Sequence, residues 1–405
     1  MSSIYPLNFI PKEYITYAMR PIRHLHLDPS NRIPLLRDQG GPAAEAMRVS
    51  KTHTAPSSAL QLSGTNASVY FIGNATTVIE WQGLRILTDP NFLHAGDHVH
   101  LGPGVTAQRL HNPAVDLHEL PAVDLVLLSH YHEDHFDRLV EDKLSRDLNI
   151  VTTPHAWGCL TSAARYAGLG HRHERKGGPF RAVHDVDTFE SVMLHVDGAG
   201  HGQFHAGADG KVPVIKITAM PGKHVPPGPL AVANDLLGAV PPTNGWLLEM
   251  GWSASTPSSN GGSADAHSLD TGYRMYISGD TLFVDELRAI PRYIEEQQVA
   301  RYPNSSPHSG DGRIDLMIVH LGGTTIPGPS MPLLMVTMDA RQGGELMRLL
   351  NPDLTIPVHF DDYSVMLSPL EDFKAEVKDM GEGWRDRVVY LGRGEQFRFR
   401  VRNSV

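Results

Sequence analysis

Cysteine is nearly absent from this sequence, since the 405 residues include only Cys159. One cysteine cannot form an intramolecular disulfide, so a reducing compartment is expected. Cys159 stands among apolar residues and is expected to pack as a small buried hydrophobe rather than act as a nucleophile. No stretch reaches the roughly 18 apolar residues of a membrane-spanning helix, and residues 1–30 lack the continuous apolar stretch of a signal peptide. We therefore expect a cytoplasmic protein with no stable membrane insertion.

Positive charge is also in short supply, with 35 Lys and Arg against 45 Asp and Glu and a formal net charge of −10. A surface of this sign disfavours the phosphate backbone, so we expect no nucleic acid partner. Aromatic residues make up only 7%, yet 41% hydrophobic and 20% charged residues are typical of a folded globular protein. Histidine, by contrast, is abundant at 23 residues, and it is the commonest metal ligand in proteins.

Residues 1–66 differ in composition from the rest of the chain. They are punctuated by proline, carry a weak excess of basic residues and end in a stretch rich in Ser, Thr and Ala. We expect them to form an N-terminal extension that packs on a main domain of residues 67–405, with a mobile part near residues 50–66. The low-complexity stretch 253–270 is expected to be a flexible hairpin loop.

Short runs of β-branched and aromatic residues, bounded by Gly, Asn and Pro, predict strands through most of the chain. These runs are residues 69–72, 76–81, 84–88, 123–128, 214–218, 246–250, 273–278, 314–319 and 354–358. Helical patterns lie between the later runs, near residues 138–147, 155–167, 282–297 and 339–350. Strands that alternate with helices predict an α/β protein whose sheets are covered by helices.

Four potential metal ligands follow directly after the apolar strand that ends at Leu128. They are His130, His132, Asp134 and His135. His130 and His132 alternate and can face the same way, whereas the adjacent Asp134 and His135 cannot both join them around one ion without strain. Two metal ions satisfy this geometry.

The pattern His130-x-His132-x-Asp134-His135 resembles the signature of the metallo-β-lactamase-fold hydrolases. Further motifs are similar to those of the branch that contains L-ascorbate-6-phosphate lactonase and N-acyl-phosphatidylethanolamine phospholipase D: Thr88-Asp89-Pro90, Gly102-Pro103 and Leu127-Leu128-Ser129-His130. The resemblance covers most of the chain. It implies an α/β fold, the four-layer αββα metallo-β-lactamase sandwich, with residues 67–405 as the catalytic domain.

The resemblance also implies the remaining ligands, each at the end of a predicted strand. His224 stands where the family has a third histidine of the first metal site, Asp280 matches the bridging aspartate, and His359 fits the last histidine of the second site. The first metal would be held by His130, His132 and His224, and the second by Asp134, His135 and His359, with Asp280 shared. Two Zn²⁺ are expected, although iron and manganese accept the same ligands. Such a pair makes hydroxide available at neutral pH.

Other residues around the metals have expected roles as well. Asp134 is expected to orient the hydroxide and take its proton, and Tyr363 to donate to a substrate oxygen. His320 ends a predicted strand and is expected to face the metals from there. Asp89 is a candidate acceptor for the N–H of a ligating histidine, with a plain turn residue as the alternative. Thr324 lies near the site in sequence and is expected to serve packing.

One departure from the branch bears on the substrate. Relatives often carry a histidine before the helix that follows the Gly-Gly element, whereas residues 336–341 of this chain contain none. Lys223 and Arg341 are single cations, so a phosphoester would find few partners. We therefore expect a hydrolase that opens a lactone or lactam, or cleaves another carboxylic ester or amide, in a small molecule.

Other functions stay open. A phosphodiesterase of the phospholipase D type is the first alternative, and an iron-dependent redox enzyme and a noncatalytic metal-binding protein are further ones. A complete set of ligands weighs against the noncatalytic protein. The expected partner is a small-molecule substrate, and a homo-oligomer is left open.

Overall fold

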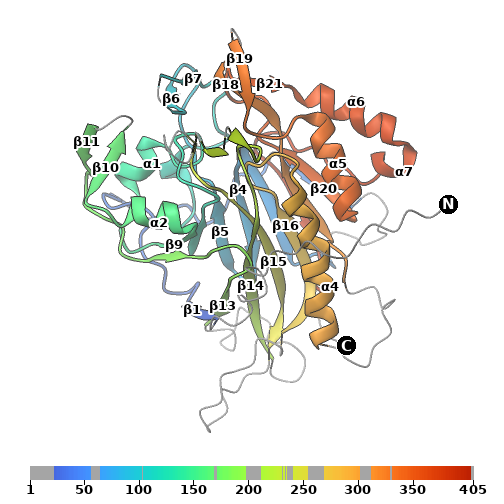
Figure 1. The fold of residues 1–405 in the computed structure, drawn as a ribbon. Coiled ribbons are helices and arrows are strands. Elements are labelled where there is room, and N and C mark those ends of the chain that lie inside the picture. The colour runs from blue at the N-terminus through green and yellow to red at the C-terminus, as the bar shows by residue number, and fades with distance from the viewer. Residues whose placement is uncertain are drawn as a thin grey trace, which may run out of the picture.

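The computed structural model describes residues 22–55, 64–102, 104–167, 171–197, 211–229, 231–232, 234, 240–253, 269–301, 312–328 and 331–402. Within these ranges two large β-sheets face each other, and helices cover the outer face of each sheet (Figure 1). The expected four-layer αββα sandwich is confirmed by this arrangement.

One large sheet has eight strands. Their spatial order is β12 (Val183–Asp185), β9 (Asn149–Thr152), β8 (Leu125–Leu127), β5 (Leu84–Thr88), β4 (Thr76–Trp81), β3 (Ala67–Gly73), β22 (Glu395–Phe399) and β2 (Lys51–His53). Because β5, β8 and β9 run parallel, their carboxyl ends lie at the same edge of the sheet.

The other large sheet has seven strands. Their order is β1 (Arg23–Leu27), β13 (Ser191–Val196), β14 (Val212–Pro221), β15 (Asn244–Ser253), β16 (Asp270–Ile277), β17 (Leu316–His320) and β20 (Leu354–Val358). β16, β17 and β20 are parallel. β14 shares their direction, since β14 and β16 are both antiparallel to β15.

Smaller elements complete the described fold. Three small sheets are β6 (His98–His100) with β7 (Thr106–Gln108), β10 (Ala164–Ala167) with β11 (His171–Glu174), and β18 (Gly322–Gly328) between β19 (Met331–Met335) and β21 (Met366–Ser368). The helices are α1 (Arg138–Lys143), α2 (Pro154–Leu160), α4 (Ala289–Arg301), α5 (Ala340–Leu350), α6 (Leu370–Met380) and α7 (Glu382–Arg385), with 3-10 turns η3 (Leu117–Glu119) and η6 (Asp285–Arg288). No helix in the described ranges is long and apolar enough to cross a membrane.

Alternation within single strands explains why the strands read as continuous apolar runs. In β3, Val69 and Phe71 pack between the two sheets, while Tyr70 and Ile72 pack in the layer of α1 and α2. β17 repeats this pattern between the sheets and the layer of α4, α5 and α6. A strand that is buried on both faces needs apolar residues at every position, and each such side chain contributes roughly 1.5–3 kcal/mol.

The helix expected over residues 155–167 is wrong beyond Leu160. Both the backbone N–H and the hydroxyl of Thr161 donate to the carbonyl of Trp157, at 2.9 and 2.8 Å, where the helix ends. Residues 164–167 form β10 instead. Cys159 in α2 is half-buried, and burial raises the pKa of its thiol to about 11, so the reactive thiolate is scarce near neutral pH.

Residues near the N-terminus supply one edge strand to each large sheet. β1 pairs with β13 and β2 pairs with β22, both in parallel. The mobility expected near residues 50–66 is wrong for residues 51–53, because they form β2 and His53 lies 2.7 Å from the carboxylate of Glu395. Residues 56–63 and the expected hairpin tip at 254–268 lie outside the described residues.

Candidate metal centre

The predicted site residues come from the carboxyl ends of strands at one edge of the two sheets. In chain order they are Asp89 after β5, His130 after β8, His224 after β14, Asp280 after β16, His320 at the end of β17 and His359 after β20. Two backbone hydrogen bonds hold the facing edges together. Asn244 donates to the carbonyl of Ser129 at 3.1 Å, and His359 donates to the carbonyl of Asn74 at 2.9 Å.

The structure brings all seven predicted ligands together in overlapping groups. These groups are His130, His132 and Asp134; His130, His224 and Asp280; and Asp134, His135, Asp280 and His359, each with candidate ligand atoms within 4.8 Å of one another. His130, Asp134 and Asp280 each belong to two of the groups, as ligands placed between two ions would. Imidazole nitrogens and carboxylate oxygens form a donor set that zinc, iron and manganese all accept.

Several ring nitrogens of these histidines form no hydrogen bond among the described residues, so they fit a metal. The Nε2 atoms of His130, His132, His135 and His359 are buried and hydrogen-bond to none of the described residues. Nδ1 of His359 donates to the carbonyl of Leu321 at 3.0 Å, and Nδ1 of His224 donates to that of Pro241 at 2.7 Å. A ring that donates from Nδ1 presents the lone pair of Nε2, which is the form in which histidine binds a metal.

Asp89 and Ser129 orient two of these histidines. Oδ1 of Asp89 accepts hydrogen bonds from the N–H of Ser129 at 2.7 Å and from its hydroxyl at 2.9 Å. Because that hydroxyl donates to Asp89, its oxygen accepts from Nδ1 of His130, 2.9 Å away. Oδ2 of Asp89 lies 3.4 Å from Nδ1 of His135. Asp89 thus contacts one candidate ligand directly and another through Ser129, which fits the orienting role rather than a plain turn.

Two neighbouring side chains contact the carboxylate of Asp280. Nδ1 of His320 lies 3.0 Å from its Oδ1, and the hydroxyl of Thr337 donates to its Oδ2 at 2.8 Å. The same Oδ2 lies 3.3 Å from Nε2 of His135 and 3.5 Å from that of His359. His320 thus contacts the carboxylate of Asp280 and can position it. His320 also forms a group with Asp89 and His135 that could hold a metal ion, so its expected role facing the metals stays a prediction. Thr337 was missed, although it lies in the stretch that departs from the family.

Carboxylates and histidines shift each other's pKa values in opposite directions. Burial opposes the charge of Asp134, but His135 and His132 hold its pKa well below the usual range. Burial also opposes the charge of His135, yet Asp280, Asp134 and Asp89 raise its pKa well above the ordinary value. Burial lowers the pKa of His224 to about 4. The raised pKa of His135 shows that the carboxylates create a field that favours a cation at this place.

Three residues other than glycine have left-handed backbone at this edge. Their φ angles are 52° for Asn74, 35° for Asp89 and 60° for His359. Each such conformation costs roughly 1–3 kcal/mol and persists only where the surroundings hold it. Asn74 shows how this is done, because its Nδ2 donates to the carbonyl of Asp134 at 2.7 Å. Strain of this kind is concentrated at functional sites.

A buried ion pair supports the loop that carries Asp134. Nη2 of Arg109 lies 3.1 Å from Oδ1 of Asp362, and both side chains are almost fully buried. The other oxygen of Asp362 accepts the N–H of Asn74 at 2.5 Å. Arg393 lies 2.9 Å from the same carboxylate. Sequence reasoning missed this support, because an arginine and an aspartate so far apart in the chain leave no local pattern.

Tyr363 does not lie where its expected role requires. Its side chain is 1% exposed, and its hydroxyl accepts from Nδ2 of Asn91 at 2.8 Å and from Nη1 of Arg109 at 3.3 Å. Burial raises the pKa of this hydroxyl. The hydroxyl belongs to a buried network, and Tyr363 is not among the described residues that line the pocket. The expectation that Tyr363 donates to a substrate is therefore corrected.

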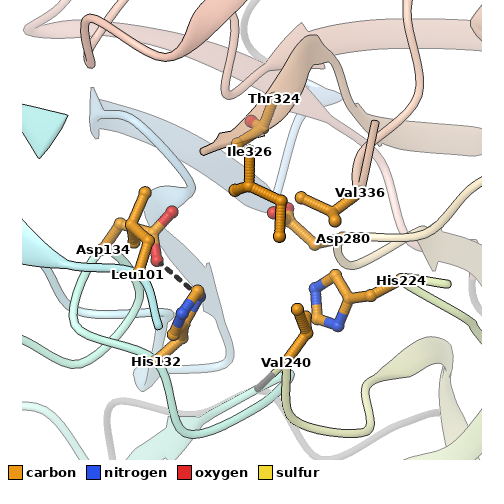
Figure 2. Close-up of a pocket in the computed structure, with 9 residues that line it drawn as sticks. All are labelled: Leu101, His132, Asp134, His224, Val240, Asp280, Thr324, Ile326 and Val336. Carbon is orange, nitrogen blue, oxygen red and sulfur yellow. Dashed lines mark ion pairs between the residues drawn. The ribbon is translucent and has the colours of Figure 1, made fainter. Parts of the chain in front are cut away.

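A small pocket opens over the cluster (Figure 2). His132, Asp134, His224 and Asp280 contribute to its lining, together with Leu101, Val240, Thr324, Ile326 and Val336. No lysine or arginine is among the described residues of this lining. The two single cations noted in the sequence are paired elsewhere, Lys223 with Glu286 and Arg341 with Glu345.

We expect about two equivalents of transition metal per chain, because the seven candidate ligands in three overlapping groups exceed what one ion can use. Elemental analysis of protein purified without chelator is the measurement. His359→Asn should lower the content toward one equivalent, whereas His53→Asn, a change far from the cluster, should not. One equivalent in the wild type, unchanged after zinc supplementation, would rule out a binuclear site.

Known proteins match this chain in parts. Residues 68–209 match the Beta-lactamase superfamily domain. An uncharacterized protein of Mycobacterium tuberculosis is 44% identical over 70 residues, which are 17% of this chain and 18% of that protein. The mitochondrial N-acyl-phosphatidylethanolamine-hydrolyzing phospholipase D of Saccharomyces cerevisiae is 34% identical over 84 residues, 20% of this chain and 17% of that protein. The alignments thus span less than a fifth of these curated relatives.

A solved structure matches over a much longer stretch. The isothiocyanate hydrolase from Delia radicum gut bacteria superposes with a TM-score of 0.53 at 16% identity, covering 82% of this chain and 99% of that one. Together with the domain match, this likeness confirms the resemblance found in the sequence: the protein has the metallo-β-lactamase fold.

Proposed function

We propose that the protein is a binuclear metal-dependent hydrolase that acts on a small uncharged ester or amide, with lactones and lactams as the leading substrates. The observation that carries the proposal is the position of Asp280 in two groups of histidines, beside a pocket. Four of the candidate histidines have a buried Nε2 atom with no hydrogen bond among the described residues. Zinc suits these ligands best, and iron and manganese are the alternatives.

Two such ions supply a hydroxide nucleophile at neutral pH and polarise the carbonyl that is attacked. The chain provides the rest of the chemistry. Asp134 is ionised and lines the pocket, so it can orient the attacking water and accept its proton. His320 and Thr337 fix the carboxylate of Asp280 from the opposite side. Asp134 is thus assigned proton transfer, whereas His320 and Thr337 are assigned the positioning of Asp280.

The lining of the pocket favours an uncharged substrate. A phosphodiester would bring a negative charge beside Asp134 and Asp280, and the described lining offers no lysine or arginine to pair with it. The match to a yeast phospholipase D keeps a phosphodiesterase as the second candidate.

The test is a substrate panel on zinc-loaded protein: γ-butyrolactone, a γ-lactam, p-nitrophenyl acetate and bis(p-nitrophenyl) phosphate. Phenethyl isothiocyanate joins the panel because a fold neighbour is named for that class. The best uncharged cyclic substrate should exceed the phosphodiester at least about tenfold in kcat/KM, since a missing charge-assisted hydrogen bond costs about 1.5–3 kcal/mol. Inorganic phosphate should inhibit only weakly.

Chelation is the matched control for this panel. Turnover should disappear after metal removal and return on addition of zinc, because the nucleophile depends on the metal. Phosphodiester turnover above that of every lactone and lactam would reverse the ranking in favour of the phospholipase-like candidate. Full turnover by metal-free protein would rule out the metal-dependent mechanism of hydrolysis.

A further inference from the structure

The side chain of Thr324 in β18 is buried. The residue is 3% exposed, and its Oγ1 hydrogen-bonds to none of the described residues. Neighbouring threonines are paired: Thr325 donates to the carbonyl of Gly323 at 2.8 Å, and Thr337 donates to Asp280 at 2.8 Å. A buried hydroxyl left unpaired costs about 1–3 kcal/mol, so its position calls for an acceptor.

The pocket is where that acceptor can sit. Thr324 and Ile326 stand two residues apart on β18 and therefore share one face of the strand, and both line the pocket drawn in Figure 2. Apart from the candidate metal ligands, Thr324 is the one polar side chain of the described lining. The other four lining residues are aliphatic: Leu101, Val240, Ile326 and Val336.

Backbone hydrogen bonds and strand pairing fix the position of Thr324 relative to the candidate metal ligands. Its carbonyl accepts the N–H of Val336 at 2.8 Å, and β18 pairs with β21 through Thr324 and Met366. Gly322 at the start of β18 has a φ of 102°, and a Cβ there would lie 2.5 Å from the carbonyl oxygen of His359. β18 thus packs directly against the backbone of His359, a candidate ligand. The hydroxyl of Thr324 on this strand is therefore a preorganised donor.

We infer that Thr324 binds the substrate by donating a hydrogen bond to an uncharged oxygen, the carbonyl of a small ester or lactone, while the aliphatic walls take up its hydrocarbon part. The inference rests on the proposed hydrolase and names the substrate class of its pocket. One donor and four aliphatic side chains suit a compact neutral molecule, because apart from the candidate metal ligands they offer one hydrogen bond and no charge. Thr324 takes the role that the sequence assigned to Tyr363.

The experiment compares Thr324→Val, which removes the hydroxyl at nearly constant shape, with Thr324→Ser, which keeps it. Thr324→Val should lower kcat/KM for the best lactone about 10- to 100-fold, between the worth of a neutral hydrogen bond and that of an oxyanion donor. Thr324→Ser should stay within about threefold of the wild type. Thr325→Val is the matched control, since its hydroxyl is bound to Gly323. Metal content should be unchanged in all three variants.

Binding provides a readout that does not need turnover. Cyclopentanone offers the same carbonyl without a leaving group, and its dissociation constant for the zinc-loaded chain is measured by calorimetry or ligand-observed NMR. Thr324→Val should weaken this binding about tenfold, the worth of one neutral hydrogen bond. If no panel substrate is hydrolysed but the ketone binds through Thr324, the proposed function fails and the binding role stands.

Other outcomes overturn the inference while leaving the hydrolase in place. These are lactone turnover and ketone binding that Thr324→Val does not change, an equal loss in Thr324→Ser, or loss of metal in Thr324→Val. No measurable ketone binding by the wild type also overturns the stated substrate class.

Discussion

Replacing Asp280 with asparagine is expected to lower kcat/KM by at least about 10³ and to reduce the metal content. Asparagine keeps the shape and can still accept from His320 or Thr337, but it loses the charge that faces Nε2 of both His135 and His359. A metal contributes several kcal/mol to transition-state stabilisation, and each 1.36 kcal/mol is about tenfold in rate. Elemental analysis and hydrolysis of the best panel substrate measure the two effects.

Asp315→Asn is the matched control for this variant. Asp315 is also buried, but it precedes β17 at the end opposite His320, where it accepts the N–H of Arg274 at 2.7 Å and lies 3.0 Å from Arg402. This change should lower thermal stability while metal content and kcat/KM remain near wild type. If the Asp280 variant kept full metal content and activity, Asp280 would be only a turn residue, and its assignment as a shared metal ligand would be wrong.

The second large effect is on stability: Asp362→Ala should lower the free energy of unfolding by about 3–5 kcal/mol. Arg109 would be left buried without its carboxylate, and the N–H of Asn74 would lose its acceptor. Breaking one side of a buried pair is costly because the remaining charge has no solvent. Denaturant unfolding of metal-free protein isolates this effect from metal binding.

The neighbouring Asp361 offers a matched comparison on the same loop. It pairs with Arg393 at 3.0 Å but is 36% exposed, so Asp361→Ala should cost about 1 kcal/mol or less. Equal losses in the two alanine variants would show that Arg109 does not depend on Asp362. Because Asn74 also holds the carbonyl of Asp134, the Asp362 variant should bind metal more weakly as well.

The positions of the ligands were predictable because strand order determines them. Buried strands read as apolar runs, and a polar residue directly after such a run must lie at the sheet edge. The topology then brings the ends of β8, β14, β16 and β20 to one place, as the grouping of His130, His224, Asp280 and His359 shows. Local sequence carries this information, since each ligand lies within a few residues of its strand.

Side chains whose orientation depends on distant partners could not be predicted in the same way. Tyr363 follows a ligand in sequence, yet Arg109 and Asn91 hold its hydroxyl in a buried network. Thr324 gave no signal, because its exposure to the pocket depends on how β18 pairs with β21.

The pairing of β22 with β2 and β3 affects how the chain folds during synthesis. His53 and Glu395, which meet in this sheet, are 342 residues apart in sequence. At about 5–20 residues per second, the ribosome needs on the order of half a minute to make the chain between them. Until then β3 has one unpaired edge, which can pair with a second nascent chain. The yield of folded protein is therefore expected to depend on chaperones that bind this edge during translation.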